Sequence, residues 1–95
     1  MLIIAHHDIS DPEGFWNAAK QVTSGLPANL KLHSVYPAMD GKTGTCIWEA
    51  ATVEEVQQFL DQNAGKFAKN SCYEVNVQGS MNLPASATLQ AQLNN

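Results

Sequence analysis

The segment at residues 30–50, which reads LKLHSVYPAMDGKTGTCIWEA, constrains the fold of this chain most strongly. Both of its ends are rich in β-branched and aromatic residues, and Pro37, Gly41 and Gly44 punctuate its middle. This pattern is typical of two strands joined by a turn. We therefore expect a β-hairpin that carries polar and aromatic side chains on its strands rather than in loops. These side chains are His33, Tyr36, Cys46, Trp48 and Glu49.

Two helix starts and two further strands flank the hairpin. Residues 1–7 form a short apolar run that predicts a first strand. The sequence Ser-Asp-Pro-Glu at 10–13 signals a helix start, either through Asp11 as the cap or through a Ser-x-x-Glu capping box. A second helix is expected to begin after Thr52, which opens a Thr-x-x-Glu box. Residues 71–78, SCYEVNVQ, alternate strictly and predict a last strand.

The resulting order, β-α-β-β-α-β, predicts an α+β protein of the ferredoxin-like, split β-α-β kind. Right-handed crossovers would give one four-stranded antiparallel sheet with both helices on one face. Residues 1–78 would form this domain, and residues 79–95 a tail rich in small and amide side chains. The tail could form a weak helix, an arm docked on a partner or a disordered end, and we expect partial order.

Size and charge limit the classes of partner. The chain has 95 residues, enough for one small domain, and its net charge is −4. Its basic residues are five scattered lysines, which argues against nucleic acid as a partner. No apolar run approaches the ~20 residues of a membrane span, and the first residues lack the pattern of a signal peptide. We therefore expect a cytoplasmic protein that does not bind membranes.

Charged residues make up only 15% of the chain. Charge depletion is typical of a subunit interface, but a plainly neutral surface would look the same. The two cysteines, Cys46 and Cys72, do not make a disulfide framework. They are interpreted as small, buried or half-buried thiols.

Strand alternation assigns the side chains of the hairpin to two faces. A turn centred near Gly41 would place His33 opposite Glu49. The face under the helices would then carry Ser34, Tyr36, Cys46 and Trp48, joined by Tyr73 from the last strand. The opposite face would carry His33, Val35, Ile47 and Glu49, joined by Cys72 and Glu74. One of His6 and His7 would join it, and the register of the first strand decides which.

This second face could be solvent-exposed, or a second subunit could cover it with its own sheet. In the covered case, His33, Glu49 and Glu74 would supply acid–base groups, because a partly desolvated carboxylate has a raised pKa. His6 or His7 would lie nearby. Tyr36, Trp48 and Tyr73 are expected mainly in the core, with a flat aromatic wall for a ligand as the alternative.

The chain resembles the dimeric α/β-barrel superfamily in the order and length of its elements over residues 1–78. The sequence HSVYPAMDGKTGTCIWEA, followed by a capped helix and YEV, is also similar to small bacterial proteins of this superfamily, some described as nickel-binding. The resemblance implies a homodimer in which two sheets pack around a ligand cavity. The superfamily includes cofactor-free monooxygenases, polyketide cyclases, haem-degrading enzymes and accessory proteins of pigment biosynthesis, and the fold does not choose among them.

Three functions therefore stay open. The first is a homodimer, without cofactor, that binds a small aromatic or polyketide-like molecule between its sheets, as a cofactor-free monooxygenase, a cyclase-like enzyme or an accessory protein. The second is metal binding, because several side chains are ligand types for zinc, nickel or iron, although no specific metal site is predicted. The third is a scaffold that docks through its tail. No catalytic signature decides whether the protein is an enzyme. The ligand-type side chains are His6, His7, Asp8, His33, Glu49 and Glu74.

Overall fold

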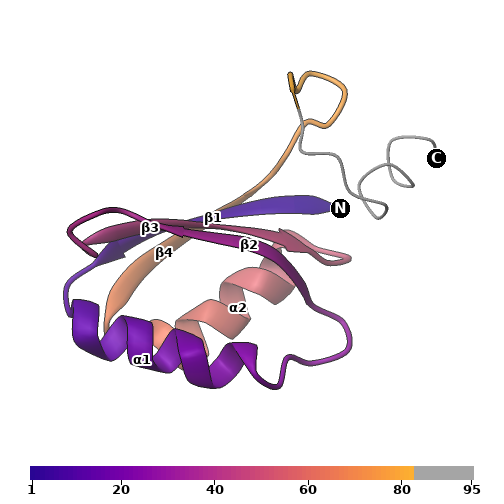
Figure 1. Cartoon of the computed structure of the whole chain (residues 1–95). Helices are drawn as coiled ribbons and strands as arrows, with labels where there is room; N and C mark the ends of the chain where they lie inside the picture. Colours follow the sequence, from indigo (N-terminus) through magenta and orange to yellow (C-terminus); the bar gives the residue numbers. More distant parts are fainter. Residues whose placement is uncertain (83–95) are drawn as a thin grey trace.

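The computed structural model describes residues 1–82 and shows one α+β domain (Figure 1). Its sheet has the strand order β2-β3-β1-β4 with every neighbouring pair antiparallel, and both helices cover one face. This arrangement confirms the predicted β-α-β-β-α-β order and the split β-α-β topology. The elements are β1 (Leu2–Ile9), α1 (Pro12–Thr23), β2 (Lys31–Pro37), β3 (Thr43–Glu49), α2 (Val53–Ala64) and β4 (Ala68–Glu74).

The start of α1 follows the first of its two predicted capping patterns. The side chain of Asp11 accepts a hydrogen bond from the backbone N–H of Gly14 at 3.1 Å, and Pro12 occupies the first helical position. The hydroxyl of Ser10 instead donates to the carbonyl oxygen of Phe67 at 3.0 Å. This bond and the backbone bonds of Ser10 and Asp11 to the same carbonyl hold the start of α1 beside β4.

The start of α2 is the predicted capping box. The backbone N–H of Glu55 donates to the Thr52 hydroxyl at 3.2 Å, and the Thr52 N–H donates to the Glu55 carboxylate at 3.1 Å. Gly65 ends the helix as its C-cap. Both helix starts were therefore encoded by short, local patterns.

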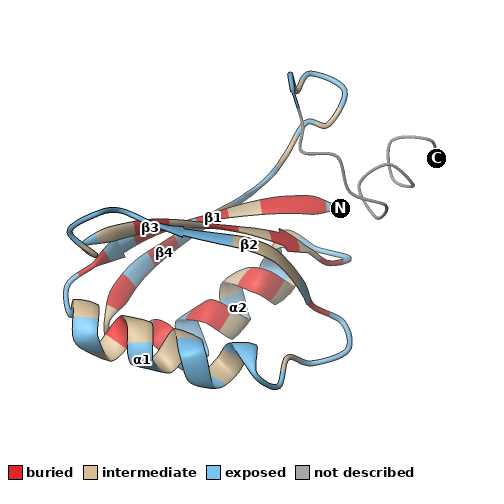
Figure 2. Ribbon diagram, in the orientation of Figure 1, coloured by how far each residue is buried: buried red, intermediate tan, exposed pale blue. Residues whose placement is uncertain are grey.

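The core lies between the sheet and the helices (Figure 2). Its centre joins β1 and β3 to α2, with Ile3, Trp48 and Val56 almost fully buried. A smaller cluster at the other end contains Phe15, the only residue of α1 that is buried. Helix α1 therefore packs on the sheet mainly through its first turns, whereas α2 packs on the sheet along its whole length.

The register of the hairpin differs from the prediction along the whole of β2, because Lys31 and not His33 lies opposite Glu49. A β-bulge between Leu32 and Ser34 adds one residue to β2, so Val35 lies opposite Cys46 rather than Ile47. Because a one-residue slip moves each side chain to the other face, Val35 faces the helices. The predicted places of Ser34 and Tyr36 under the helices are therefore wrong, since both lie on the open face.

The last strand begins three residues earlier than predicted, and its faces are reversed. In β4, Cys72 lies opposite Ala5 and Tyr73 opposite Ile4. Ala5 is fully buried under the helices, so Cys72 shares its face and Tyr73 lies on the open face. The prediction was wrong because the alternation over 71–78 fits either face, and only pairing with β1 decides between them.

Residues 75–82 leave the sheet after β4. The N–H of Val75 still donates to the carbonyl oxygen of Leu2 at 2.8 Å, and the chain then rises away from the sheet on the side opposite the helices (Figure 1). Turn bonds from Gly79 to Asn76 and from Ser80 to Val77 shape this segment, which we call the arm. The part of the predicted tail beyond residue 82 lies outside the described residues.

Candidate functional site

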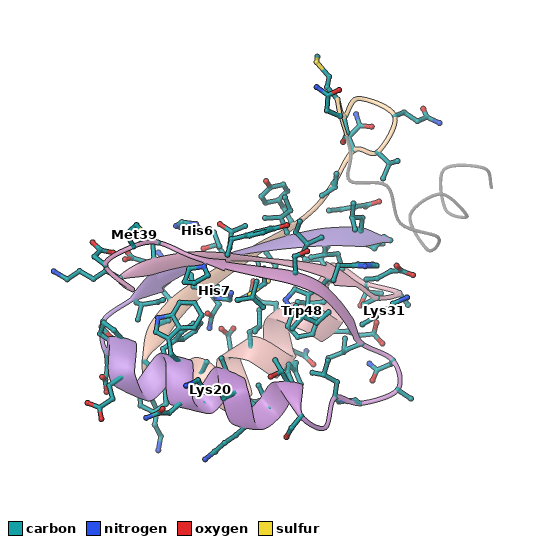
Figure 3. The ribbon with its side chains drawn as sticks, viewed as in Figure 1. His6, His7, Lys20, Lys31, Met39 and Trp48 are labelled. Atoms are coloured by element: carbon teal, nitrogen blue, oxygen red, sulfur yellow. The ribbon has the colours of Figure 1, made fainter. Side chains whose placement is uncertain are left out.

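The two adjacent histidines of β1 lie on opposite faces of the sheet (Figure 3). His6 lies on the open face, opposite Thr45 of β3 and Ser71 of β4, and is exposed. His7 lies under the sheet and has no exposed surface. The alternation of a strand requires this separation, and it settles which histidine joins the open face.

The open face brings together His33 and Glu49, as the sequence predicted. Nε2 of His33 lies 2.7 Å from Oε1 of Glu49, and their side chains are only 12% and 21% exposed. The bulge in β2 turns His33 toward Glu49 even though their backbones are not direct partners. A histidine beside a carboxylate can accept or deliver a proton, so this pair is the candidate acid–base group of the open face.

Glu74 does not join this pair. Glu74 is on β4, where it lies opposite Ile3 of β1. It therefore shares the helix-covered face with Ile3, and β4 is at the opposite edge of the sheet from β2. The predicted cluster of His33, Glu49 and Glu74 is therefore wrong in its third member. The face predicted for Glu74 was wrong for the same reason as the face predicted for Tyr73.

Aromatic rings lie at both edges of the open face. Tyr36 on β2 is 56% exposed and Tyr73 on β4 is 55% exposed, and between them lie the half-buried Ile4 and Ile47. Trp48, the third predicted aromatic residue, is 2% exposed and lies in the core. The open face thus includes two tyrosines, two aliphatic residues and the hydrogen-bonded pair of His33 and Glu49, with no helix over them.

A metal centre finds no geometric support within residues 1–82. No group of three or more histidine, cysteine, aspartate or glutamate side chains there is arranged to hold an ion. The six ligand-type side chains named from the sequence are divided between the two faces, which keeps His6 and His7 apart. None of the helices in this part of the chain is long and apolar enough to cross a bilayer.

A chain of hydrogen bonds runs under the sheet from Cys46 to Asp61. His7 Nδ1 lies 2.7 Å from Oδ1 of Asn70, and His7 Nε2 lies 3.0 Å from Sγ of Cys46. Nδ2 of Asn70 donates to a carboxylate oxygen of Asp61 at 3.2 Å. Because an amide oxygen only accepts, His7 must carry its proton on Nδ1, and its bare Nε2 accepts from the Cys46 thiol.

The two buried members of this hydrogen-bond network, His7 and Cys46, are uncharged. Burial lowers the pKa of His7, although its hydrogen bond to Asn70 acts in the opposite direction. Burial also raises the pKa of the Cys46 thiol to about 12, with a smaller contribution from Cys72. A neutral imidazole and a neutral thiol at neutral pH do not form a reactive thiolate pair. These hydrogen bonds therefore form a structural network that fixes the register of β1, β3 and β4.

Three members of this network, Asn70, Asp61 and Gln57, were not found from the sequence. Asn70 lies within β4, and Asp61 lies on α2; neither belongs to a motif. Gln57 completes the network, because its side-chain amide donates to the Asn70 carbonyl at 2.7 Å and accepts from the Cys72 N–H at 3.1 Å. The only available signal was that a histidine following buried Ile3 and Ala5 at strand spacing needs buried partners.

The sheet order and the two helices on one face define the chain as a split β-α-β protein with one covered and one open sheet face. The chain belongs to the family described as a domain of unknown function, DUF8652, whose model matches residues 4–83. The matched region contains the whole of the sheet except its first residues. No curated protein matches the chain, and no solved structure matches it.

Proposed function

We propose that the protein is a homodimer whose two open sheet faces pack together and enclose a cavity for a small ligand. The observation that carries this proposal is the composition of the open face. Tyr36 and Tyr73 expose more than half of their surface there, beside Ile4 and Ile47. Aromatic residues are enriched where proteins bind partners, so two exposed tyrosines on a sheet face without a helix over it support an interface there.

The arm favours a second copy as the occupant of this face. It extends on the same side of the sheet as the open face, and Met81 on it is 87% exposed (Figure 1). A segment that projects beyond its own domain can contact a partner that lies against the open face. The arm carries no charged residue in Val75–Asn82, so it can be buried without an ionic cost.

The ion pair defines what the enclosed cavity could do. Around His33 and Glu49, exclusion of water would strengthen electrostatic interactions and make proton transfer to or from a ligand more effective. His6, Tyr36 and Tyr73 would form the walls beside it. We therefore favour a small aromatic or polyketide-like ligand with an acidic hydroxyl, handled by a cofactor-free monooxygenase, a cyclase-like enzyme or an accessory protein of secondary-metabolite biosynthesis.

The ligand is tested with a panel of phenols and aromatic polyketides, using native mass spectrometry for binding and an oxygen electrode for turnover. Glu49→Gln keeps the shape of the pair and removes its charge, and we expect a loss of affinity of about tenfold. Glu54→Gln on the exposed surface of α2 is the matched control and should bind as the parent protein does. Equal affinity of Glu49→Gln and the control would contradict the proposal, as would a protein that binds no member of the panel.

A further inference from the structure

We infer that the outer edge of β4 is a self-pairing surface that Gln57 holds closed, and that without this side chain two copies join through β4 into one continuous sheet. β4 lies at one end of the strand order, and within residues 1–82 no strand pairs with its outer edge (Figure 1). The free edge of a strand is a template for pairing with another chain. This edge is separate from the open face, so the inference does not depend on the proposed dimer.

Every second residue of β4 turns its backbone groups away from β1. Directly after the strand, the N–H of Val75 donates to the carbonyl oxygen of Leu2 at 2.8 Å. In an antiparallel ladder the residues that bond to one neighbour alternate with those that face the other side. The odd-numbered residues of β4 therefore bond to β1, and the even-numbered ones direct their N–H and C=O groups to the outer edge. These outward residues are Ala68, Asn70, Cys72 and Glu74.

The side chain of Gln57 reaches this edge from α2 and occupies its middle. Nε2 of Gln57 donates to the carbonyl oxygen of Asn70 at 2.7 Å, and Oε1 accepts from the N–H of Cys72 at 3.1 Å. The two carboxylate oxygens of Asp61 accept from the same Nε2 at 3.2 and 3.1 Å, which fixes the orientation of the amide. One side-chain amide thus takes two backbone groups that a neighbouring strand would use.

The other edge of the sheet, β2, is protected by its own backbone. Directly after β2, the N–H of Ala38 donates to the carbonyl oxygen of Thr43 at 2.9 Å, so Pro37 faces outward and offers no N–H there. The bulge between Leu32 and Ser34 also interrupts the ladder. Prolines and bulges commonly protect edge strands. β4 contains neither, so its protection has to come from outside the strand.

The partner that fits this edge is the same edge of a second copy. A two-fold axis beside Ser71 would set Asn70 of each copy opposite Cys72 of the other in an antiparallel pair. The carbonyl oxygen and the N–H that the glutamine amide now occupies would then bond to each other between the copies. Lys69 would lie opposite Tyr73, so no like charges would face each other across the pair.

The test combines Gln57→Ala, which removes the amide and suits a helix, with Ser71→Cys as a reporter on the axis. Every protein also carries Ile47→Asp, which places a charge on the open face and prevents association there. Across the axis the two copies of position 71 would form a non-hydrogen-bonded pair with Cα atoms about 4.5 Å apart, which a disulfide can bridge. Under mild oxidation we expect this cross-link to form about tenfold faster than with the exposed control Gln58→Ala. Equal rates would overturn the inference.

A second variant separates pairing of the edges from a general loosening of the fold. Glu74→Pro removes an outward N–H, which the paired copies would use opposite Ala68, and costs β4 no bond to β1. Added to Gln57→Ala, it should return the rate of cross-linking to that of the control. Rapid cross-linking that persisted with Glu74→Pro would show that the edges do not pair and would overturn the inference. Because every protein in this test carries Ile47→Asp, its outcome is independent of the proposed dimer.

Discussion

The two faces of the sheet use similar polar residues in different ways. Under the helices, His7 is fully buried, and its ring nitrogens are both hydrogen-bonded within a network that ends at Asp61. On the open face, the His33 ring lies within hydrogen-bonding distance of the Glu49 carboxylate and no helix covers it. A buried histidine with two fixed partners specifies the fold, whereas a half-buried histidine paired with a carboxylate is free to act on something else.

The largest expected effect separates the two adjacent histidines of β1. His7→Ala should lower the free energy of unfolding by about 3 kcal/mol, because it opens a cavity and leaves Asn70 and Cys46 without their partner. His6→Ala, its neighbour on the open face, should change stability by less than about 0.5 kcal/mol. Urea denaturation measures both. Similar losses for the two variants would mean that the faces do not differ as described.

The second prediction concerns association through the open face. Ile47→Asp places a charge at the centre of the proposed interface, and the dissociation constant of the dimer should rise by about 100-fold or more. Gln62→Asp puts the same charge on the exposed side of α2 and should leave association unchanged. Sedimentation velocity over a dilution series compares them. An Ile47→Asp protein that associates as well as the control would remove the open face as the interface.

The third prediction uses pH to probe the buried network. Because burial lowers the pKa of His7, the unfolded chain binds its proton first, so stability is complete above pH 6.5 and falls as the pH drops below it. Because burial raises the pKa of Cys46 from 9.0 to about 12, stability is complete below pH 9.0 and falls as the pH rises toward 12. By pH 10.5 the loss of stability from the Cys46 thiol alone should be about 2 kcal/mol.

Cys46→Ala provides the control for the alkaline side of this profile. Its stability should fall less steeply above pH 9 than that of the parent protein, because only the Cys72 thiol, whose pKa burial raises to about 11, still contributes. Thermal unfolding recorded from pH 5 to pH 10.5 gives the comparison. If the stability of Cys46→Ala fell with pH above pH 9 as steeply as that of the parent protein, Cys46 would not be the titrating group.

The smallest expected effect is the coupling between His33 and Glu49. An exposed ion pair contributes at most about 1 kcal/mol, whereas a pair covered by a second subunit should give a coupling of about 1.5 kcal/mol or more. A double-mutant cycle with His33→Gln and Glu49→Gln measures this quantity. A coupling near zero in the associated protein would mean that the pair stays in contact with water.

Features set by residues close together in the sequence could be predicted, whereas features set by the pairing of distant strands could not. Asp11 and Thr52 marked the helix starts because caps involve residues only a few positions apart. The side chains of His33 and Glu49 meet as predicted, but the predicted register was wrong, because Lys31 lies opposite Glu49. The bulge beside His33 left no signal in the sequence, so the places of Val35 and Tyr36 were wrong.

The candidate sites show the same division. The open-face pair could be found from strand alternation, but Glu74 and Tyr73 could not be placed, because the register of β4 depends on a strand more than sixty positions away. The buried partners of His7 come from β3, β4 and α2, which only the folded topology brings together.

The central claim is that the open face of the sheet is where two copies of this chain meet. Sedimentation equilibrium of the full chain between about 5 and 200 μM tests it most directly, because standard interfaces of stable dimers hold together in this range. We expect the mass of two chains across most of the range, with a shift to one chain for Ile47→Asp. A single-chain mass for the parent protein at every concentration would contradict the account.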